Sequence, residues 1–307
     1  MSKPFNYGGQ AVIEGVMMRG SQVMAVAVRD PDGAIQTHEE PVNAALYRGT
    51  IAQLPFVRGL TLLWDALGLG MRSLMFSADV AAGEEAEFSG PLAWGTVAFS
   101  LALGVGLFIV TPSAVAEGLH RLTGVDSPLL GNVAEGVVRL LLIIAYVWAI
   151  GKFPDIERLY GYHGAEHKAI NAYEADAPLT VESVNRFPIE HPRCGTAFLL
   201  SVAVVSVLVF ALVGRPSVWV RLASRIVLLP IIAGIAYEYI RFTAKYFHVP
   251  IIRLIAEPNL ALQRLTTRQP TYDMIECSIT ALECVLAAEQ KAEKPEEVSP
   301  VAEATAV

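Results

Sequence analysis

Charged residues are scarce in this chain. They make up 17% of its 307 residues, whereas 53% of the residues are hydrophobic and the mean hydropathy is +0.45. A soluble protein of this size carries about a quarter charged residues. Because the apolar residues gather in a few long runs, the composition excludes an ordinary soluble globular protein. It predicts an integral membrane protein that is mostly α-helical and has the lipid bilayer as a partner.

Other missing features exclude further classes of protein. The three cysteines, Cys194, Cys277 and Cys284, do not make a disulfide framework, which fits polar parts that face a reducing cytosol. The first residues contain no apolar run of the kind found in a cleaved signal peptide. No basic stripe with interleaved aromatic residues occurs, so we expect no nucleic-acid partner.

Residues 1–45 are expected to form a small β-rich cytoplasmic unit. Glycines alternate with short apolar runs over residues 8–20, which is typical of strands whose backbone bends or approaches a neighbour closely. Two strand-like runs, 24–29 and 34–38, flank an Asp-Pro-Asp-Gly turn and predict a hairpin. A phosphate-binding loop is disfavoured, because neither a GxGxxG nor a Walker pattern is present.

Residues 46–91 mix apolar and basic residues with glycines, and are too interrupted to predict a transmembrane helix. They predict amphipathic helices, lying either at the membrane interface or in an ordinary core, followed by a polar connector. Residues 92–250 are predicted to form a four-helix membrane domain. It has four apolar runs close to the length that a bilayer requires: Leu92–Val110, Val133–Ile150, Ala197–Val213 and Ile226–Phe242.

The distribution of Lys and Arg predicts the orientation. The residues before Leu92 hold six of them and the connection 151–196 holds five, but the connection 111–132 holds one. Four spans with both termini in the cytoplasm satisfy this bias, which predicts a multi-pass protein of the inner or plasma membrane. Residues 251–288 are expected to form cytoplasmic helices, and the tail 289–307, rich in Ala, Glu and Pro, is expected to be disordered.

A histidine pair in the connection 151–196 carries the clearest chemical signal. If this stretch is helical, His163 and His167 lie one turn apart on one face, with Glu166 beside them. The pattern H-x-x-E-H matches that of the inverted zincins. Two neutral imidazoles at this spacing can bind one divalent metal, with zinc as the first candidate, and the adjacent glutamate can act as a general base.

A zinc site needs a third protein ligand, and a catalytic one leaves the fourth position to water. The first candidates are His191 and Cys194, which precede the third apolar run. The second is Glu238, near the cytoplasmic end of the fourth run, where an ionisable residue is costly to bury without a partner. If His191 and Cys194 both bind, the site is closed and structural. Arg193 could stabilise developing negative charge in a catalytic site.

The motifs also resemble a known family. The glycine-rich stretch Gly8–Gly20, the helix motif Tyr162–Glu174, the segment His191–Gly195 and residues 262–267 (Leu-Gln-Arg-Leu-Thr-Thr) together resemble the YqhQ-like family of bacterial membrane proteins of unknown function. The resemblance covers nearly the whole chain apart from its acidic tail. It implies a membrane protein of a group that has been labelled predicted metal-dependent enzymes, and it implies neither a substrate nor a ligand set.

Two functions from different classes are consistent with these features. The first is a metal-dependent hydrolase with its site at the cytoplasmic face of the membrane, acting on a peptide or a lipid headgroup. The second is a non-enzymatic adaptor that binds or stabilises other membrane proteins, in which the histidines only brace a loop. The metal content of the purified protein discriminates between them.

Overall fold

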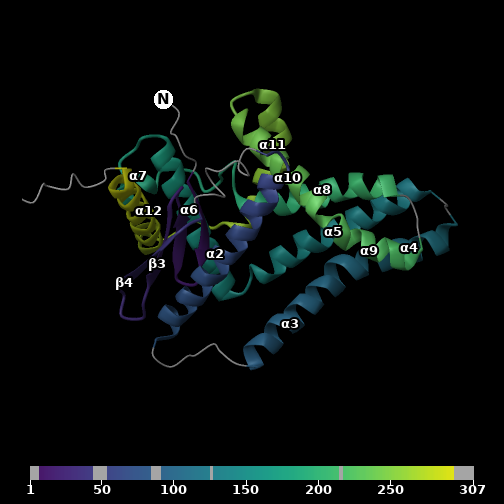
Figure 1. The fold of residues 1–307 in the computed structure, drawn as a ribbon, viewed down its shortest axis with the longest axis horizontal. Helices are drawn as coiled ribbons and strands as arrows, with labels where there is room; N and C mark the ends of the chain where they lie inside the picture. The colour runs from purple at the N-terminus through teal and green to yellow at the C-terminus, as the bar shows by residue number, and fades with distance from the viewer. Residues whose placement is uncertain (1–6, 44–53, 84–90, 125–126, 214–216, 294–307) are drawn as a thin grey trace, which may run out of the picture.

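The structure is a computed structural model that describes residues 7–43, 54–83, 91–124, 127–213 and 217–293. Figure 1 shows a β-sheet with helices packed on it at one end of the molecule. Long apolar helices extend away from this end, and further helices lie between the two regions. The mostly helical fold with a small N-terminal sheet confirms the predicted fold class at this level.

The N-terminal sheet is antiparallel, with its four strands in chain order. Its strands are β1 (Gly8–Val12), β2 (Gly15–Arg19), β3 (Val23–Arg29) and β4 (Ile35–Pro41). The turn between β3 and β4 contains Gly33 with a φ of 89°, a conformation that favours glycine. The predicted β-rich unit and its hairpin are therefore confirmed.

Both faces of the sheet are covered. One face packs Val16 and Met18 against α6 (Pro154–Glu174) and α12 (Tyr272–Glu293), and the short helix α7 (Val181–Val184) joins the same core. The alternate residue Met17 points to the other face, where α2 (Val57–Ala82) contributes Leu69. This alternation along β2 is what a strand buried on both faces requires.

Within the part of the chain that the structure describes, three helices are long and apolar enough to cross a membrane: Ala98–Thr123, Leu129–Ile150 and Gly195–Val213. The first joins α3 (Pro91–Val105), a π-helical turn (Gly106–Val110) and α4 (Thr111–Thr123), and the others lie in α5 (Pro128–Ile150) and α8 (Gly195–Val213). The first apolar helix begins at Pro91, next to the predicted start, but it continues past the predicted end at Val110 to Thr123. Pro112 does not break it, because a proline is tolerated in the first turn of α4.

The fourth predicted run, 226–242, is divided between two helices. The end of α9 (Val218–Val227) and the start of α10 (Leu229–Lys245) meet at Leu228. Pro230 lies in the first turn of α10, where it cannot donate the hydrogen bond that would continue α9. At 17 residues, α10 is shorter than the three helices above.

The segments outside the apolar runs are more continuous than predicted. Within residues 46–91, α2 is one helix of 26 residues, while 46–53 and 84–90 lie outside the described residues. Near the C-terminus, α11 (Pro250–Thr266) passes through Pro258 without a break. Helix α12 extends to Glu293, so the predicted tail begins later than residue 289, and residues 294–307 lie outside the described residues.

An ion network joins the apolar helices. The carboxylate of Glu135 on α5 accepts hydrogen bonds from Arg225 on α9 (2.8 and 2.9 Å) and from Arg139 one turn along α5 (2.7 Å). Arg139 also donates to the carbonyl oxygen of Phe108 (3.0 Å), in the π-helical turn. Glu135 and Arg139 are four residues apart, so a helix alone brings them together, whereas Arg225 comes from a distant part of the chain.

Candidate metal centre

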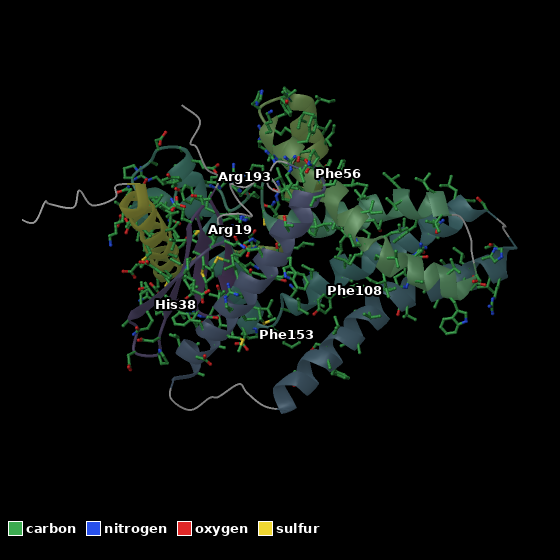
Figure 2. All side chains as sticks on the ribbon, viewed as in Figure 1. Arg19, His38, Phe56, Phe108, Phe153 and Arg193 are labelled. Atoms are coloured by element: carbon green, nitrogen blue, oxygen red, sulfur yellow. The ribbon has the colours of Figure 1, made fainter. Side chains whose placement is uncertain are left out.

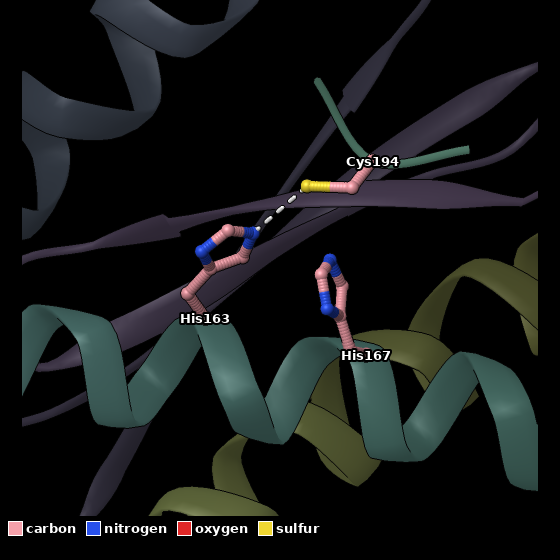
Figure 3. A group of neighbouring side chains, drawn as sticks. All are labelled: His163, His167 and Cys194. Carbon is pink, nitrogen blue, oxygen red and sulfur yellow. Dashed lines mark hydrogen bonds between the residues drawn. The ribbon is translucent and has the colours of Figure 1, made fainter. Parts of the chain in front are cut away.

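Helix α6 places the histidine pair. Pro154 in its first turn and the acidic residues Asp155 and Glu157 favour a helix start at this point. Most residues from Tyr160 to Ala172 are buried, because α6 packs against both the sheet and α12. Figure 3 shows that His163 and His167 point from one face of this helix. Their ring centroids are 4.4 Å apart. The predicted helical arrangement is thus present.

Backbone carbonyls fix the tautomer of both imidazoles. Nδ1 of His163 lies 2.9 Å from the carbonyl oxygen of Thr266, and Nδ1 of His167 lies 2.5 Å from that of Ile189. Because a carbonyl oxygen only accepts, each Nδ1 must carry the proton, and each neutral ring keeps a free lone pair on Nε2. Metal-binding histidines are oriented in this way by partners of their second nitrogen.

Cys194 completes a group of three ligand atoms. Its Sγ lies 3.2 Å from Nε2 of His163, and the ligand atoms of Cys194, His163 and His167 all lie within 4.8 Å of one another (Figure 3). Cys194 directly precedes α8, where the backbone N–H of Thr196 donates to Sγ (3.4 Å). A helix N-terminus stabilises a negatively charged thiolate, which is the form of cysteine that binds metals.

Glu166 lies beside this group. One of its carboxylate oxygens is 3.9 Å from Nε2 of His163 and 3.8 Å from Nε2 of His167. Burial raises the pKa of Glu166 to about 6, although its interactions with His163 and with the N–H of Gly9 oppose this shift. The backbone of Gly9 approaches closely: a Cβ at this position would lie 2.9 Å from Cγ of Glu166 and 2.5 Å from the carbonyl oxygen of Met17. The glycine-rich strand β1 therefore covers the acid.

His191 lies near the group but is engaged elsewhere. Its Nε2 lies 3.3 Å from a carboxylate oxygen of Glu174, and its Nδ1 accepts from the backbone N–H of Arg193 (3.4 Å). Burial holds the pKa of His191 below its usual value, although Glu174 opposes the shift. The side chain of Gln263 bonds both the N–H (3.0 Å) and the carbonyl (2.8 Å) of His191. The structure therefore brings His191 next to the three ligands as a braced neighbour.

Arg193 and Glu238 have partners of their own. The guanidinium of Arg193 pairs with Glu174, at the C-terminal end of α6. Glu238 forms a two-pronged pair with Arg58 of α2, and accepts the backbone N–H of Phe56 (3.2 Å). Among the described residues, the group that could hold a metal does not include Glu238. The candidate third ligand that the structure brings to the histidines is Cys194.

A cavity of about 690 Å³ opens beside the ligands. His163 and Glu166 of α6 lie in its wall, together with His191, Arg193 and Cys194 of the segment before α8. Further parts of the wall come from β1, β2, α2, α5, α8 and α10. A small molecule in this cavity would therefore meet both the ligand group and Glu166.

The donor set suits zinc. Two imidazole nitrogens and one thiolate are ligands that zinc binds in proteins, and three protein ligands leave a coordination position open. A calcium or magnesium site would instead need several oxygen ligands. Both histidines can bind zinc through Nε2 and keep their hydrogen bonds at Nδ1. With the buried thiol of Cys194, this arrangement fits a zinc ion.

Several of these features carry no recognisable signal in the sequence. The carbonyls of Thr266 and Ile189 belong to the backbone and come from distant segments. The role of Glu174 is suggested only by its place on the face of α6 that carries the histidines. Gly9 is part of a glycine-rich stretch that predicts close backbone approach, although the sequence does not name Glu166 as its neighbour.

Comparison with known proteins gives the family. A family model described as "Protein of unknown function (DUF1385)" matches residues 54–288. The "Uncharacterized protein YqhQ" of Bacillus subtilis (strain 168) is 31% identical over 310 residues, covering 96% of this chain and 97% of that protein. No solved structure matches the chain. The resemblance inferred from the motifs is confirmed, and the chain belongs to the DUF1385 family of proteins of unknown function.

Proposed function

We propose that this chain is a zinc-dependent hydrolase of the cytoplasmic membrane face. The observation that carries the proposal is the orientation of the two histidines. Both Nδ1 atoms are held by backbone carbonyls, so both Nε2 lone pairs are available next to Cys194 and Glu166. A pair of histidines that only braced a loop would not need a buried thiol and a carboxylate at the same point.

His163, His167 and Cys194 would hold the zinc ion. Zinc with three protein ligands supplies Lewis-acid chemistry that makes water a nucleophile at neutral pH. Glu166 accepts the proton of the attacking water, whose oxygen forms a bond to the carbonyl carbon or phosphorus of the substrate. Glu166 then returns the proton to the leaving oxygen or nitrogen as the old bond breaks.

The engagement of His191 supports a catalytic site over a closed structural one. Four protein ligands would saturate zinc, but both ring nitrogens of His191 face other partners, Glu174 and the N–H of Arg193. His191 would therefore not complete the coordination of the metal. Arg193 lines the cavity and can stabilise negative charge that develops on the substrate.

The membrane arrangement is part of the proposal. We propose four spans, with α10 as a short fourth one, and both termini in the cytoplasm of the inner or plasma membrane. The bias of Lys and Arg supports this orientation, which puts α6 and the start of α8 on the cytoplasmic side. Helix α2 lies at the interface, because its exposed apolar residues recur with helical spacing: Trp64, Leu67, Met71, Leu74 and Met75.

Glu166→Gln tests the enzymatic role. The variant keeps the shape of the side chain but cannot accept the proton, so we expect it to bind zinc as the wild type does and to lose about 10²–10⁴-fold in turnover. In cells that lack their own copy of the gene, wild-type protein should restore the normal lipid and peptide profile, whereas Glu166→Gln should not.

The result that favours the adaptor is equally specific. If Glu166→Gln binds zinc and restores the cells fully, the site is structural, and the chain acts by binding or stabilising other membrane proteins. Glu238→Gln is the control, because it removes a carboxylate that pairs with Arg58 outside the ligand group.

A further inference from the structure

The cavity beside the ligand group has features that select a class of substrate. We propose that it binds a phospholipid with an anionic headgroup, drawn from the surrounding bilayer, with the phosphate toward the ligand group and the start of the acyl chains along the apolar wall. This inference rests on the proposed function, because it names the substrate class of the same site.

The apolar wall of the cavity is built from the ends of the helices that cross the membrane. Tyr146, Val147 and Ile150 come from the last turn of α5, and Phe198 comes from the first turn of α8. Both helices are long and apolar enough to span a bilayer. Their residues in the cavity wall lie at the helix ends, where α5 and α8 would leave the bilayer. A lipid therefore has a short apolar path from the bilayer to the cavity.

The interfacial helix α2 closes the same wall. Its residues Ala66 and Leu69 face the cavity, whereas Trp64 and Leu67 on its other side are 80% and 62% exposed. A helix with apolar residues on both sides suits a position between lipid and a lipid-binding cavity. Figure 1 shows α2 between the sheet and the apolar helices.

The polar part of the wall selects an anionic headgroup. Arg19 of β2 and Arg193, both labelled in Figure 2, line the cavity together with His163 and Glu166. Arginine is the side chain best suited to phosphate, since its planar guanidinium can donate two parallel hydrogen bonds. The combination of two guanidinium groups and an apolar wall matches an amphipathic anion better than a neutral or a cationic ligand.

The cavity has a suitable size. About 690 Å³ lies in the range of roughly 300–1,000 Å³ that is usual for small-molecule sites. This is enough for a phosphate headgroup and the first part of the acyl chains, with the remainder left in the bilayer.

A peptide substrate fits less well. An extended peptide would add to the free edge of β1, which also lines the cavity. The N–H of Gly9 on that edge is engaged, because it donates to Glu166. An added strand would have to displace the group that orients the proposed base.

Photocrosslinking in nanodiscs tests the proposal. The probe is phosphatidylglycerol with a photoactivatable group near the start of one acyl chain, diluted into phosphatidylcholine. The full-length protein is compared with Ala66→Trp, which fills the cavity, and with Ala98→Trp, the same change at an exposed alanine of α3. Zinc content is measured in all three samples.

We expect the wild type and Ala98→Trp to be crosslinked at cavity residues, and Ala66→Trp to be crosslinked about tenfold less, with equal zinc in all three. Arg19→Gln should lower the yield with phosphatidylglycerol and leave the weak background with a phosphatidylcholine probe unchanged. Inorganic phosphate at millimolar concentration should not compete.

Several outcomes would overturn the inference. Equal crosslinking in Ala66→Trp and Ala98→Trp, with zinc bound, would place the lipid elsewhere. Full competition by inorganic phosphate would make the ligand a free phosphate, and protection of the cavity by a peptide at the β1 edge would make it a peptide. Absence of zinc in the wild type would instead overturn the proposed function, whatever the crosslinking shows.

Discussion

At the scale of single residues, Gly9 helps to fix the position of Glu166, the proposed base. A methyl group at Gly9 would meet the carbonyl oxygen of Met17 at 2.5 Å and Cγ of Glu166 at 2.9 Å, so either the strand or the acid must move. At Gly8, one residue earlier, a methyl group meets nothing within 4 Å. The two positions therefore form a matched pair of tests on one strand.

We expect Gly9→Ala to destabilise the protein by about 1–3 kcal/mol, as overpacking does, while Gly8→Ala stays close to the wild type. Thermal unfolding in detergent measures the difference. Zinc content should be retained in both variants, because neither glycine belongs to the ligand group. Equal melting temperatures for the two variants would show that β1 does not hold Glu166.

The candidate ligands illustrate what a sequence can and cannot predict about residues. The spacing of His163 and His167 on one helix face predicts their proximity, because a helix fixes the neighbours of each side chain. The choice among His191, Cys194 and Glu238 depends on tertiary contacts. Glu238 is near the end of an apolar run as predicted, but Arg58, from a segment 180 residues earlier, is its partner. No local pattern identifies that pairing.

At the scale of elements, the ion network fastens α9 to its neighbours. Glu135 and Arg225 are each 3% exposed, and Arg225 also lies 3.8 Å from the ring centroid of Phe210 on α8. Removing one partner of such a pair leaves the other charge buried and uncompensated. The sequence predicts one continuous apolar helix over residues 226–242. In the structure α9 ends at Val227, and the bond between Arg225 and Glu135 holds α9 against α5.

We expect Glu135→Gln to destabilise the protein by about 3–5 kcal/mol. The control is Glu117→Gln, which removes a carboxylate that pairs with the exposed Arg121 one turn along α4, and should change stability by less than about 0.5 kcal/mol. Urea or thermal unfolding in detergent measures both variants. A similar small effect for the two would contradict the role given to the network.

In addition to its core packing, α12 is bonded to residues next to the sheet through one carboxylate near its C-terminal end. Glu289 accepts hydrogen bonds from Tyr7 (2.6 Å), the hydroxyl of Ser21 (2.8 Å) and the N–H of Gln22 (3.1 Å). Burial alone would raise the pKa of Glu289, but these hydrogen bonds outweigh it and hold the pKa below its usual value. The sequence assigns residue 289 to a disordered tail, because composition does not reveal this tertiary attachment.

The sign of the pH dependence follows from the lowered pKa. The stabilisation by ionised Glu289 is present above the unfolded value of about 4.3, and is lost as the pH falls through the lower folded value. We expect Glu289→Gln to lose about 1–3 kcal/mol at pH 7 and to approach the wild type below about pH 4. The exposed Glu283→Gln on the same helix is the control, and unfolding at pH 7 and pH 4 is the measurement. A gap that widens at low pH would contradict this account.

For the whole molecule, the arrangement in the membrane is the main expectation. The apolar runs predict membrane-crossing helices, because each run is close to the number of residues that a helix needs to cross a bilayer. The limits of the first helix and the division of the fourth run depend on how prolines and a buried ion network are accommodated, which composition does not encode. The β-rich unit is predictable for a simpler reason, since its turn and alternation are local.

Labelling of single cysteines tests the orientation. With both termini in the cytoplasm, Thr123→Cys at the end of α4 should react with a membrane-impermeant maleimide in intact cells. Glu182→Cys in α7, which is also exposed, should react only after the membrane is opened, and the wild type should stay unlabelled in intact cells. The reverse pattern would place the histidine pair on the outer side.

The central claim is that His163, His167 and Cys194 bind one zinc ion, and the most direct measurement is the zinc content of the purified full-length protein. We expect about one zinc per chain in the wild type and in Glu238→Gln. We expect loss of zinc in His163→Ala, His167→Ala and Cys194→Ser, and the comparison uses variants that still unfold cooperatively. No zinc in the wild type, or zinc kept in all three ligand variants, would contradict the account.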